Sequence, residues 1–123
     1  KNLDYDRYNS PSRTLLKSAM TSGAAQALKD YNLQRKNTGD TISESKINEI
    51  GYVFVRMKKF DDAIAIFEQN TLDFPQSWNA WDSFAEAYMD KGDKGLAIKY
   101  YEKSLQLNPG NTNGAEQLKK LKQ

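Results

Sequence analysis

Two stretches of this 123-residue chain carry one pattern at a separation of 34 residues. The first is KKFDDAIAIFEQNTLDFP at 58–75, and the second is GDKGLAIKYYEKSLQLNP at 92–109. Both keep an alanine, an aromatic residue and a proline in register, namely Ala63 and Ala97, Phe67 and Tyr101, and Pro75 and Pro109. A short unit of this kind cannot bury its apolar side alone, so the repeat predicts units that stack on one another.

Apolar residues recur at the three- and four-residue spacing of helices, as Ile47, Ile50 and Phe54 illustrate. Alternation with a period of two is nearly absent, so no strands are expected. Helices are predicted over residues 11–20, 23–36, 44–58, 60–73, 78–91, 94–107 and 112–122.

Residues with good capping chemistry stand at the predicted helix starts. Thr41 to Glu44 fits a capping box, and Ser43 is a second candidate for the same N-cap. Ser77 and Asp93 are the candidates for the next two helices. The prolines of the repeat follow helices that they cannot continue.

The repeat resembles the tetratricopeptide pattern, W-x2-L-G-x2-Y, then A-x3-F, then P. Two units carry it, at 44–77 and 78–111. The signature positions are Ile47, Ile50, Gly51, Phe54, Ala63, Phe67 and Pro75 in the first unit, and Trp81, Phe84, Ala85, Tyr88, Ala97, Tyr101 and Pro109 in the second. The resemblance implies an all-α fold: a short right-handed α-solenoid of stacked antiparallel helix hairpins.

Each signature position has an expected physical role. Gly51 and Ala85 are small where the two helices of one unit touch, and Ala63 and Ala97 are the small residues that face them. The aromatic positions are expected to fill the space between units. Asn70 and Ser104 depart from the small apolar residue that the family usually has there, so looser helix contacts are expected.

The flanking segments complete one domain. Residues 1–10 are interpreted as a linker or terminus, and 11–36 as a degenerate helix hairpin in which Ala27 and Tyr31 echo A-x3-F. Residues 112–123 are expected to form the solvating helix that closes such arrays.

Composition excludes several classes of protein. With 18 basic and 16 acidic side chains and no strongly basic segment, nucleic acid is not an expected partner. No apolar run approaches the ~20 residues of a membrane span, so a membrane is not expected either. The polar start has no apolar segment typical of a signal peptide, which fits a fragment of a longer chain.

The residues that most enzymes need are missing. Histidine and cysteine are absent, which removes the usual general base, the thiol nucleophile and most zinc sites. No cofactor and no metal are therefore predicted, and the chain is expected not to be an enzyme.

Two patterns nevertheless suggest chemistry. SESK at 43–46 fits the S-x-x-K of penicillin-recognising serine enzymes, but the companion S-D-N and K-T-G elements are missing, and Ser43 as an N-cap is the favoured interpretation. The pairs Asp61–Asp62 and Asp90/Asp93 suggest a cation site. An acidic first helical turn explains the former better, and solvated turn residues the latter.

In tetratricopeptide proteins the first helix of each unit lines a concave groove that takes peptides or partner helices. The resemblance assigns to this groove Asn48, Tyr52, Val55, Arg56, Asn79, Asp82, Glu86 and Met89. Asp82 and Glu86 lie one helical turn apart and are expected to project together. Two carboxylates would repel an acidic tail, so a segment with Lys or Arg beside an apolar anchor is the expected ligand. The alternative is that these residues simply face solvent.

A second resemblance concerns residues 74–121, which look like the C-terminal tails of bacterial serine hydrolases of the beta-lactamase-like and esterase-like kinds. It implies a protein-interaction module whose partner is the catalytic domain of its own full-length chain, in the periplasm or secreted. The alternatives are a free-standing scaffold that binds a protein in trans, with a cytoplasmic location, and self-association through the ends of the array.

Overall fold

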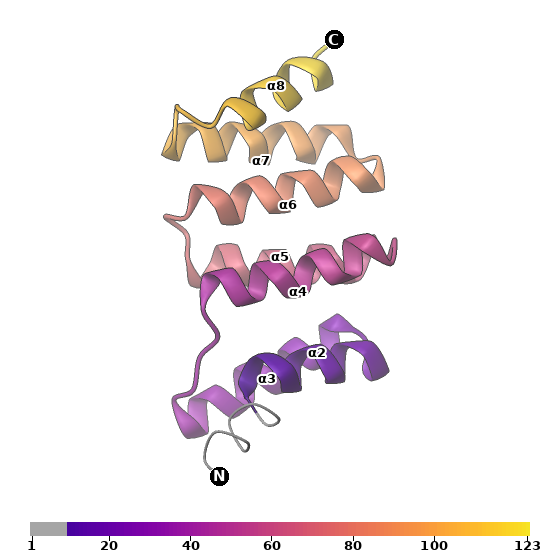
Figure 1. Ribbon diagram of the computed structural model, residues 1–123, viewed down its shortest axis with the longest axis vertical. Coiled ribbons are helices and arrows are strands. Elements are labelled where there is room, and N and C mark those ends of the chain that lie inside the picture. The colour runs from indigo at the N-terminus through magenta and orange to yellow at the C-terminus, as the bar shows by residue number, and fades with distance from the viewer. Residues whose placement is uncertain (1–9) are drawn as a thin grey trace.

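The computed structural model describes residues 10–123, so the predicted linker at 1–10 lies outside the described residues except for Ser10. Within this range the chain forms seven helices and no strand. They stack in chain order from the N-terminal hairpin to the C-terminal helix (Figure 1). The helices are α2 (Pro11–Ser22), α3 (Ala24–Thr38), α4 (Glu44–Arg56), α5 (Phe60–Asp73), α6 (Trp78–Lys91), α7 (Lys94–Leu107) and α8 (Thr112–Leu121). The predicted all-helical solenoid of tetratricopeptide type is confirmed.

Side-chain caps repeat with the unit. Ser43, Ser77 and Asn111, each 34 residues apart, begin α4, α6 and α8, and each side chain accepts a hydrogen bond from the backbone N–H three residues further on. The capping box at Thr41 is wrong, because α4 begins at Glu44 and Ser43 is therefore its N-cap. Asn111 places α8 where the first helix of a further unit would begin.

The two helices of the first unit meet at Gly51 on α4 and Phe67 on α5. A Cβ atom on Gly51 would fall inside the van der Waals envelope of the Phe67 ring. Phe67 is fully buried, and so are the two small residues Ala63 and Ala97. Their predicted burial is confirmed, and a glycine at position 51 is what lets the ring close this contact.

Asn70 and Ser104 do not loosen the units as expected. Both side chains are fully buried. The Asn70 amide donates to the Glu44 carbonyl at 3.1 Å, and the Ser104 hydroxyl donates to the Trp78 carbonyl at 2.9 Å. Glu44 and Trp78 are 34 residues apart, and so are the two donors. The two units therefore make the same hydrogen bond at equivalent positions. It joins the second helix of each unit to the start of the first.

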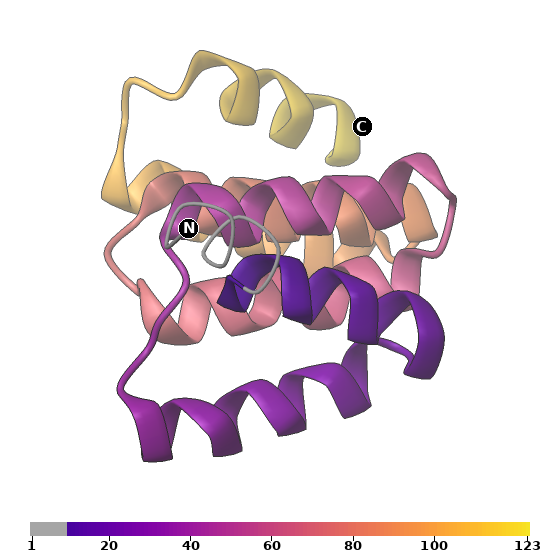
Figure 2. The same cartoon turned by 60° about the horizontal axis from the view of Figure 1, so that its bottom comes forward.

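The N-terminal hairpin stacks differently from the two complete units. Helix α5 packs closely on α6, whereas α3 packs on α5 and α2 on α4, with no comparable contact between α3 and α4. In Figure 2 the connection from α3 to α4 runs along one side of the molecule. The Tyr31 hydroxyl accepts from the Ile42 backbone N–H at 2.8 Å and holds this connection against the core.

Polar bonds attach α3 to α5. The Arg35 guanidinium binds both carboxylate oxygens of Asp73, at 2.9 and 3.0 Å. Asp62 accepts from the Ala24 backbone N–H at 3.0 Å, where α3 begins. Asp62 therefore has a tertiary role in addition to the helix-dipole role expected for it.

Two helix bounds differ from the prediction for backbone reasons. Gly23 was predicted to lie inside the helix at 23–36. In the structure it is the single residue between α2 and α3, and its φ of 89° is a conformation that favours glycine. Helix α4 ends at Arg56 rather than residue 58, because the chain turns at Lys58, whose φ is 61°.

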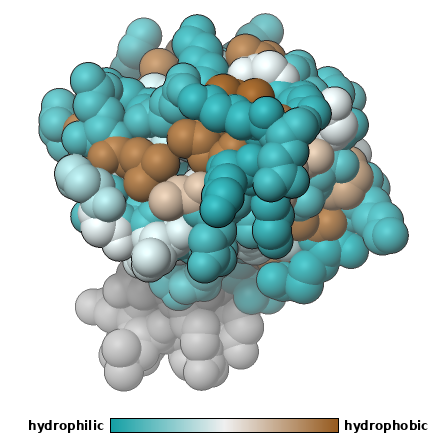
Figure 3. Space-filling view, turned by 90° about the horizontal axis from the view of Figure 1, so that it is seen from above, coloured by the Kyte–Doolittle hydropathy of each residue, from teal (hydrophilic) through white to brown (hydrophobic). Residues whose placement is uncertain are grey.

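The described surface is mainly hydrophilic when viewed from the α8 end, with hydrophobic side chains in separate patches (Figure 3). None of the helices in residues 10–123 has the length and apolar character needed to cross a membrane.

We expect Gly51→Ala to lower the free energy of unfolding by about 1–3 kcal/mol, because the added methyl group displaces the Phe67 ring from a packed core. The control is Gly95→Ala in α7, whose Cβ would meet only Asp93 Oδ1, at 3.9 Å. Alanine should stabilise that helix by up to about 1 kcal/mol. Urea denaturation measures both, and an unchanged Gly51→Ala midpoint would contradict the proposed role of this contact.

Candidate binding surfaces

The residues predicted to line a groove lie on α4 and α6, which pack against each other. Their exposure varies: Arg56 is exposed, Asp82 is buried, and the other six are partly buried. We call this set the α4–α6 face. It comprises Asn48, Tyr52, Val55 and Arg56 from α4, and Asn79, Asp82, Glu86 and Met89 from α6.

Tyr52 and Glu86 join the two units across this face. The Tyr52 hydroxyl donates to Glu86 Oε1 at 2.6 Å and lies 3.2 Å from the Ser83 hydroxyl. Residues 52 and 86 are 34 apart, so they hold the same place in successive units. Burial raises the pKa of the Glu86 carboxyl, and the hydrogen bond from Tyr52 opposes that rise in part. Burial and the bond to Glu86 raise the pKa of Tyr52, which stays a donor.

Asp82 does not project beside Glu86 as an accessible carboxylate. It is 8% exposed, and its Oδ1 accepts from the Asn111 amide at 2.8 Å. The same amide donates to Ser104 Oγ at 3.0 Å. Burial raises the pKa of Asp82, and the bond from Asn111 opposes the rise. The expectation of two jointly exposed carboxylates is therefore wrong, because one of them holds the start of α8 against α6 and α7.

Asn79 is also engaged within the protein. Its amide donates to Glu44 Oε2 at 3.4 Å, and the Ser77 hydroxyl donates to the same oxygen at 3.2 Å. Three buried polar atoms lack a hydrogen-bond partner in the described part of the chain: Asn48 Oδ1, Asn70 Oδ1 and the Tyr101 hydroxyl. Burial, and then the charges of Asp82 and Glu86, raise the pKa of Tyr101.

The motifs that suggested chemistry have structural roles. Ser43 Oγ accepts from the Lys46 backbone N–H as the cap of α4, and Lys46 Nζ lies 3.8 Å from Glu49. Asp61 forms an ion pair of 2.8 Å with Lys91. Over residues 10–123, no group of three or more acidic, histidine or cysteine side chains is arranged to hold a metal ion.

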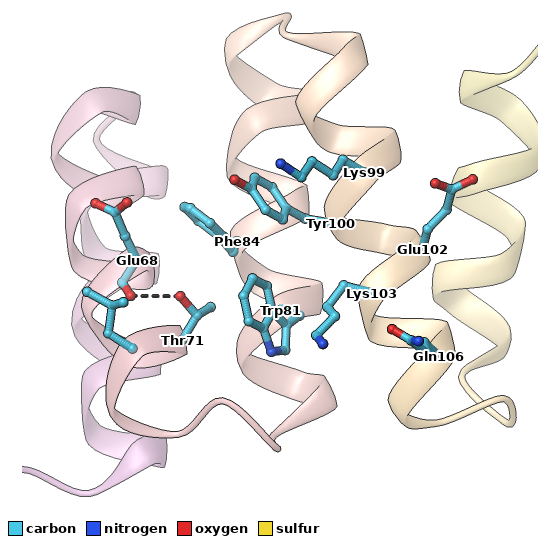
Figure 4. Close-up of a pocket in the computed structure, with 10 residues that line it drawn as sticks. Glu68, Thr71, Trp81, Phe84, Lys99, Tyr100, Glu102, Lys103 and Gln106 are labelled. Carbon is cyan, nitrogen blue, oxygen red and sulfur yellow. Dashed lines mark hydrogen bonds between the residues drawn. The ribbon is translucent and has the colours of Figure 1, made fainter.

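A second surface was not predicted from the sequence. A groove of about 600 Å³ opens between α5, α6 and α7, and residues expected to be interior, Trp81 and Phe84, form its floor with Tyr100 (Figure 4). Tyr100 precedes the signature residue Tyr101 in the sequence. This pair of consecutive tyrosines was the sequence feature that could have indicated an aromatic surface beside the core. Helical spacing alone could not show that α5 and α7 would leave Trp81 and Tyr100 partly exposed.

We expect Asn111→Ala to destabilise the protein more than Asp93→Ala, although both remove an N-cap side chain. Asp93 makes one bond, to the Leu96 backbone N–H of its own helix. Losing a cap costs about 0.5–2 kcal/mol. Asn111→Ala additionally leaves the buried Asp82 carboxylate unpaired, at a further cost of about 1–3 kcal/mol. Hydrogen exchange should show α8 opening in this variant, and equal costs for the two changes would refute the role assigned to Asn111.

We expect Glu86→Gln to stabilise the protein increasingly as pH rises above 4.5, the ordinary pKa of a glutamate side chain. Because its pKa lies above the ordinary value of 4.5, folded Glu86 keeps its proton to a higher pH than the unfolded chain does. The free energy of unfolding contributed by this group therefore falls as pH rises from the ordinary to the raised pKa, and glutamine removes the fall. Denaturation at several pH values measures it, with exposed Glu116→Gln as the control. Parallel pH profiles for wild type and Glu86→Gln would contradict the prediction.

Comparison with known proteins bears on the second complete unit. Residues 78–111, which α6 and α7 form, match the family model of the tetratricopeptide repeat. No curated protein matches the chain, so the resemblance to serine hydrolase tails gains no support. The match supports the tetratricopeptide repeat family for this array of helix hairpins, and the fold of that family is in general a non-catalytic one used for protein–protein interaction.

Proposed function

We propose that this chain is a non-enzymatic interaction module that binds a segment of a protein across the α4–α6 face. The observation that carries the proposal is the 2.6 Å bond from Tyr52 to Glu86. It holds a partly buried carboxylate in place between two successive units of a fold that generally serves protein recognition.

The chemistry of this face favours a basic segment. Glu86 Oε1 accepts from Tyr52, whereas the other carboxylate oxygen accepts no hydrogen bond from the described residues and is open to a ligand. Val55 and Met89 are partly buried and supply apolar area beside it. A Lys or Arg next to an apolar side chain matches this arrangement, whereas an acidic tail would meet an anion.

The identity of the partner is a further hypothesis. One is that the partner is a hydrolase domain of the same polypeptide, which rests on the sequence resemblance of residues 74–121 alone. The other is a separate protein that this array binds as a scaffold. The reading frame of the parent gene decides between them, since the first requires a catalytic domain upstream of Lys1.

The test of the proposed function is a titration with two peptides that share one apolar anchor and differ in the sign of their charges. We expect the basic peptide to bind more tightly and to weaken as salt rises. Glu86→Gln should weaken it by about 1.4- to 5-fold, the range of a single exposed ion pair.

Glu116→Gln removes the same charge from α8 and should leave this binding unchanged. A preference for the acidic peptide on the α4–α6 face, or equal binding by the Glu86→Gln protein, would refute the proposal.

A further inference from the structure

The groove between α5, α6 and α7 has a preformed aromatic floor. The Tyr100 ring centroid lies 5.7 Å from that of Trp81 and 4.5 Å from that of Phe84. Trp81 Nε1 donates to the Pro75 carbonyl at 2.9 Å, which fixes the indole. Tyr88 extends the cluster along α6. Because these rings already hold one another, a ligand that covers them orders few side chains on binding.

The two sides of the groove, formed by α5 and α7, remain apart. Helix α3 packs on α5 at the N-terminal end of the array, but α7 makes no comparable contact with α5. Leu72 on α5, which lines the groove, is 69% exposed. Trp81 and Tyr100 are only partly buried beneath the opening. An apolar side chain entering here would bury area against residues of all three helices.

Helix α7 contributes two lysines that carry no ion pair. Lys99 Nζ lies 5.6 Å from the Tyr100 ring centroid, and Lys103 Nζ lies 5.7 Å from that of Trp81. In the described residues neither has a carboxylate within 4.0 Å. Glu102 beside them is neutralised by Lys122 at 3.0 Å. Figure 4 shows both lysines on the α7 side and Glu68 on the opposite side. The α7 side therefore presents unpaired positive charge next to the aromatic floor.

Lys99 and Lys103 stand four residues apart on one helix, so their charges follow each other by one turn. A ligand that pairs with both lysines needs two carboxylates at a similar spacing. It also needs apolar side chains that enter the groove between these carboxylates and α5. We propose that this groove binds an acidic amphipathic helix of a partner protein. Its apolar residues lie on Trp81, Phe84 and Tyr100, and its Asp or Glu residues pair with the two lysines.

This site is separate from the α4–α6 face and opposite to it in charge preference. Trp81, Phe84 and Tyr88 follow one stripe of α6, while Asp82, Glu86 and Met89 follow another. One helix thus serves both surfaces. A second copy of the chain is a poorer occupant through α8, because that helix carries two lysines, Lys119 and Lys120, and a single acidic residue, Glu116, whereas the groove requires two acidic residues.

The test uses a peptide of about 14 residues, four helical turns, with leucine and phenylalanine anchors and glutamates four residues apart. The control peptide carries lysine in place of each glutamate. Trp78→Phe leaves Trp81 as the one tryptophan of the 123-residue chain and so makes its fluorescence a reporter of the groove. We expect the acidic peptide to bind with a shift in Trp81 emission, and the basic peptide to bind the groove more weakly.

Matched variants identify the contacts. Lys99→Gln with Lys103→Gln should weaken the acidic peptide by roughly 2- to 30-fold, the combined range of two exposed ion pairs. Lys119→Gln with Lys120→Gln on α8 changes the net charge equally and should have little effect. Leu72→Ser alters an exposed side chain and should weaken binding without unfolding the protein. Glu86→Gln should leave this binding unchanged, so failure of the α4–α6 proposal would not affect the result.

Three results of the peptide titrations would overturn the proposal: no shift in Trp81 emission with the acidic peptide, equal binding of the two peptides, or equal weakening by the two pairs of lysine substitutions. Sedimentation velocity without peptide tests whether a second copy of the chain occupies the groove, because it measures whether the protein forms a dimer. A dimer that Leu72→Ser abolishes would assign the groove to a second copy of the chain and would likewise overturn it.

Discussion

The contact between the two helices of the first complete unit, α4 and α5, requires a residue with no side chain at position 51. Gly51 has no Cβ, and the Phe67 ring takes the space that one would fill. This allows α4 and α5 to pack closely and directs their remaining apolar side chains outward, toward neighbouring units. Since a lone hairpin leaves that outer surface exposed to water, close pairing within a unit makes stacking between units obligatory.

Stacking in turn places polar groups in the interior, where each needs a partner. The repeat meets this need with the bonds from Asn70 and Ser104 to the starts of α4 and α6. Asn111 meets it at the end of the array, because its amide serves both Asp82 and Ser104. Helix α8 is thus held by polar bonds to Asp82, which has no other hydrogen-bond partner among the described residues, and to Ser104, which is also bonded to Trp78.

The same packing explains why α6 carries two kinds of surface. One side faces α4 and holds Glu86 against Tyr52, with a pKa raised by burial. The other side supplies the aromatic floor between α5 and α7. Helix α6 packs against α4, α5 and α7, and the side chains that these helices leave partly exposed remain for recognition. The two proposals assign ligands of opposite charge to these sides.

The helices, their order and their fold class could be read from the sequence, because the 34-residue period, the helical spacing of apolar residues and the caps are local signals. Local signals also indicated the buried small residues Ala63 and Ala97. The polarity of Asn70 and Ser104 was misread as a weakness, since their acceptors lie 26 residues away in the chain. The α4–α6 face was predicted by position, but position could not show that Asp82 is bonded to Asn111.

Only the tertiary structure decided which side chains are free, because that depends on distances between helices rather than on spacing within one. It placed α3 against α5 through Arg35 and Asp73, and it left α5 and α7 far enough apart to uncover Trp81 and Tyr100. The sequence by itself determined that the chain forms stacked helical units. The packing of those units decided where a partner finds uncovered rings and unpaired charge.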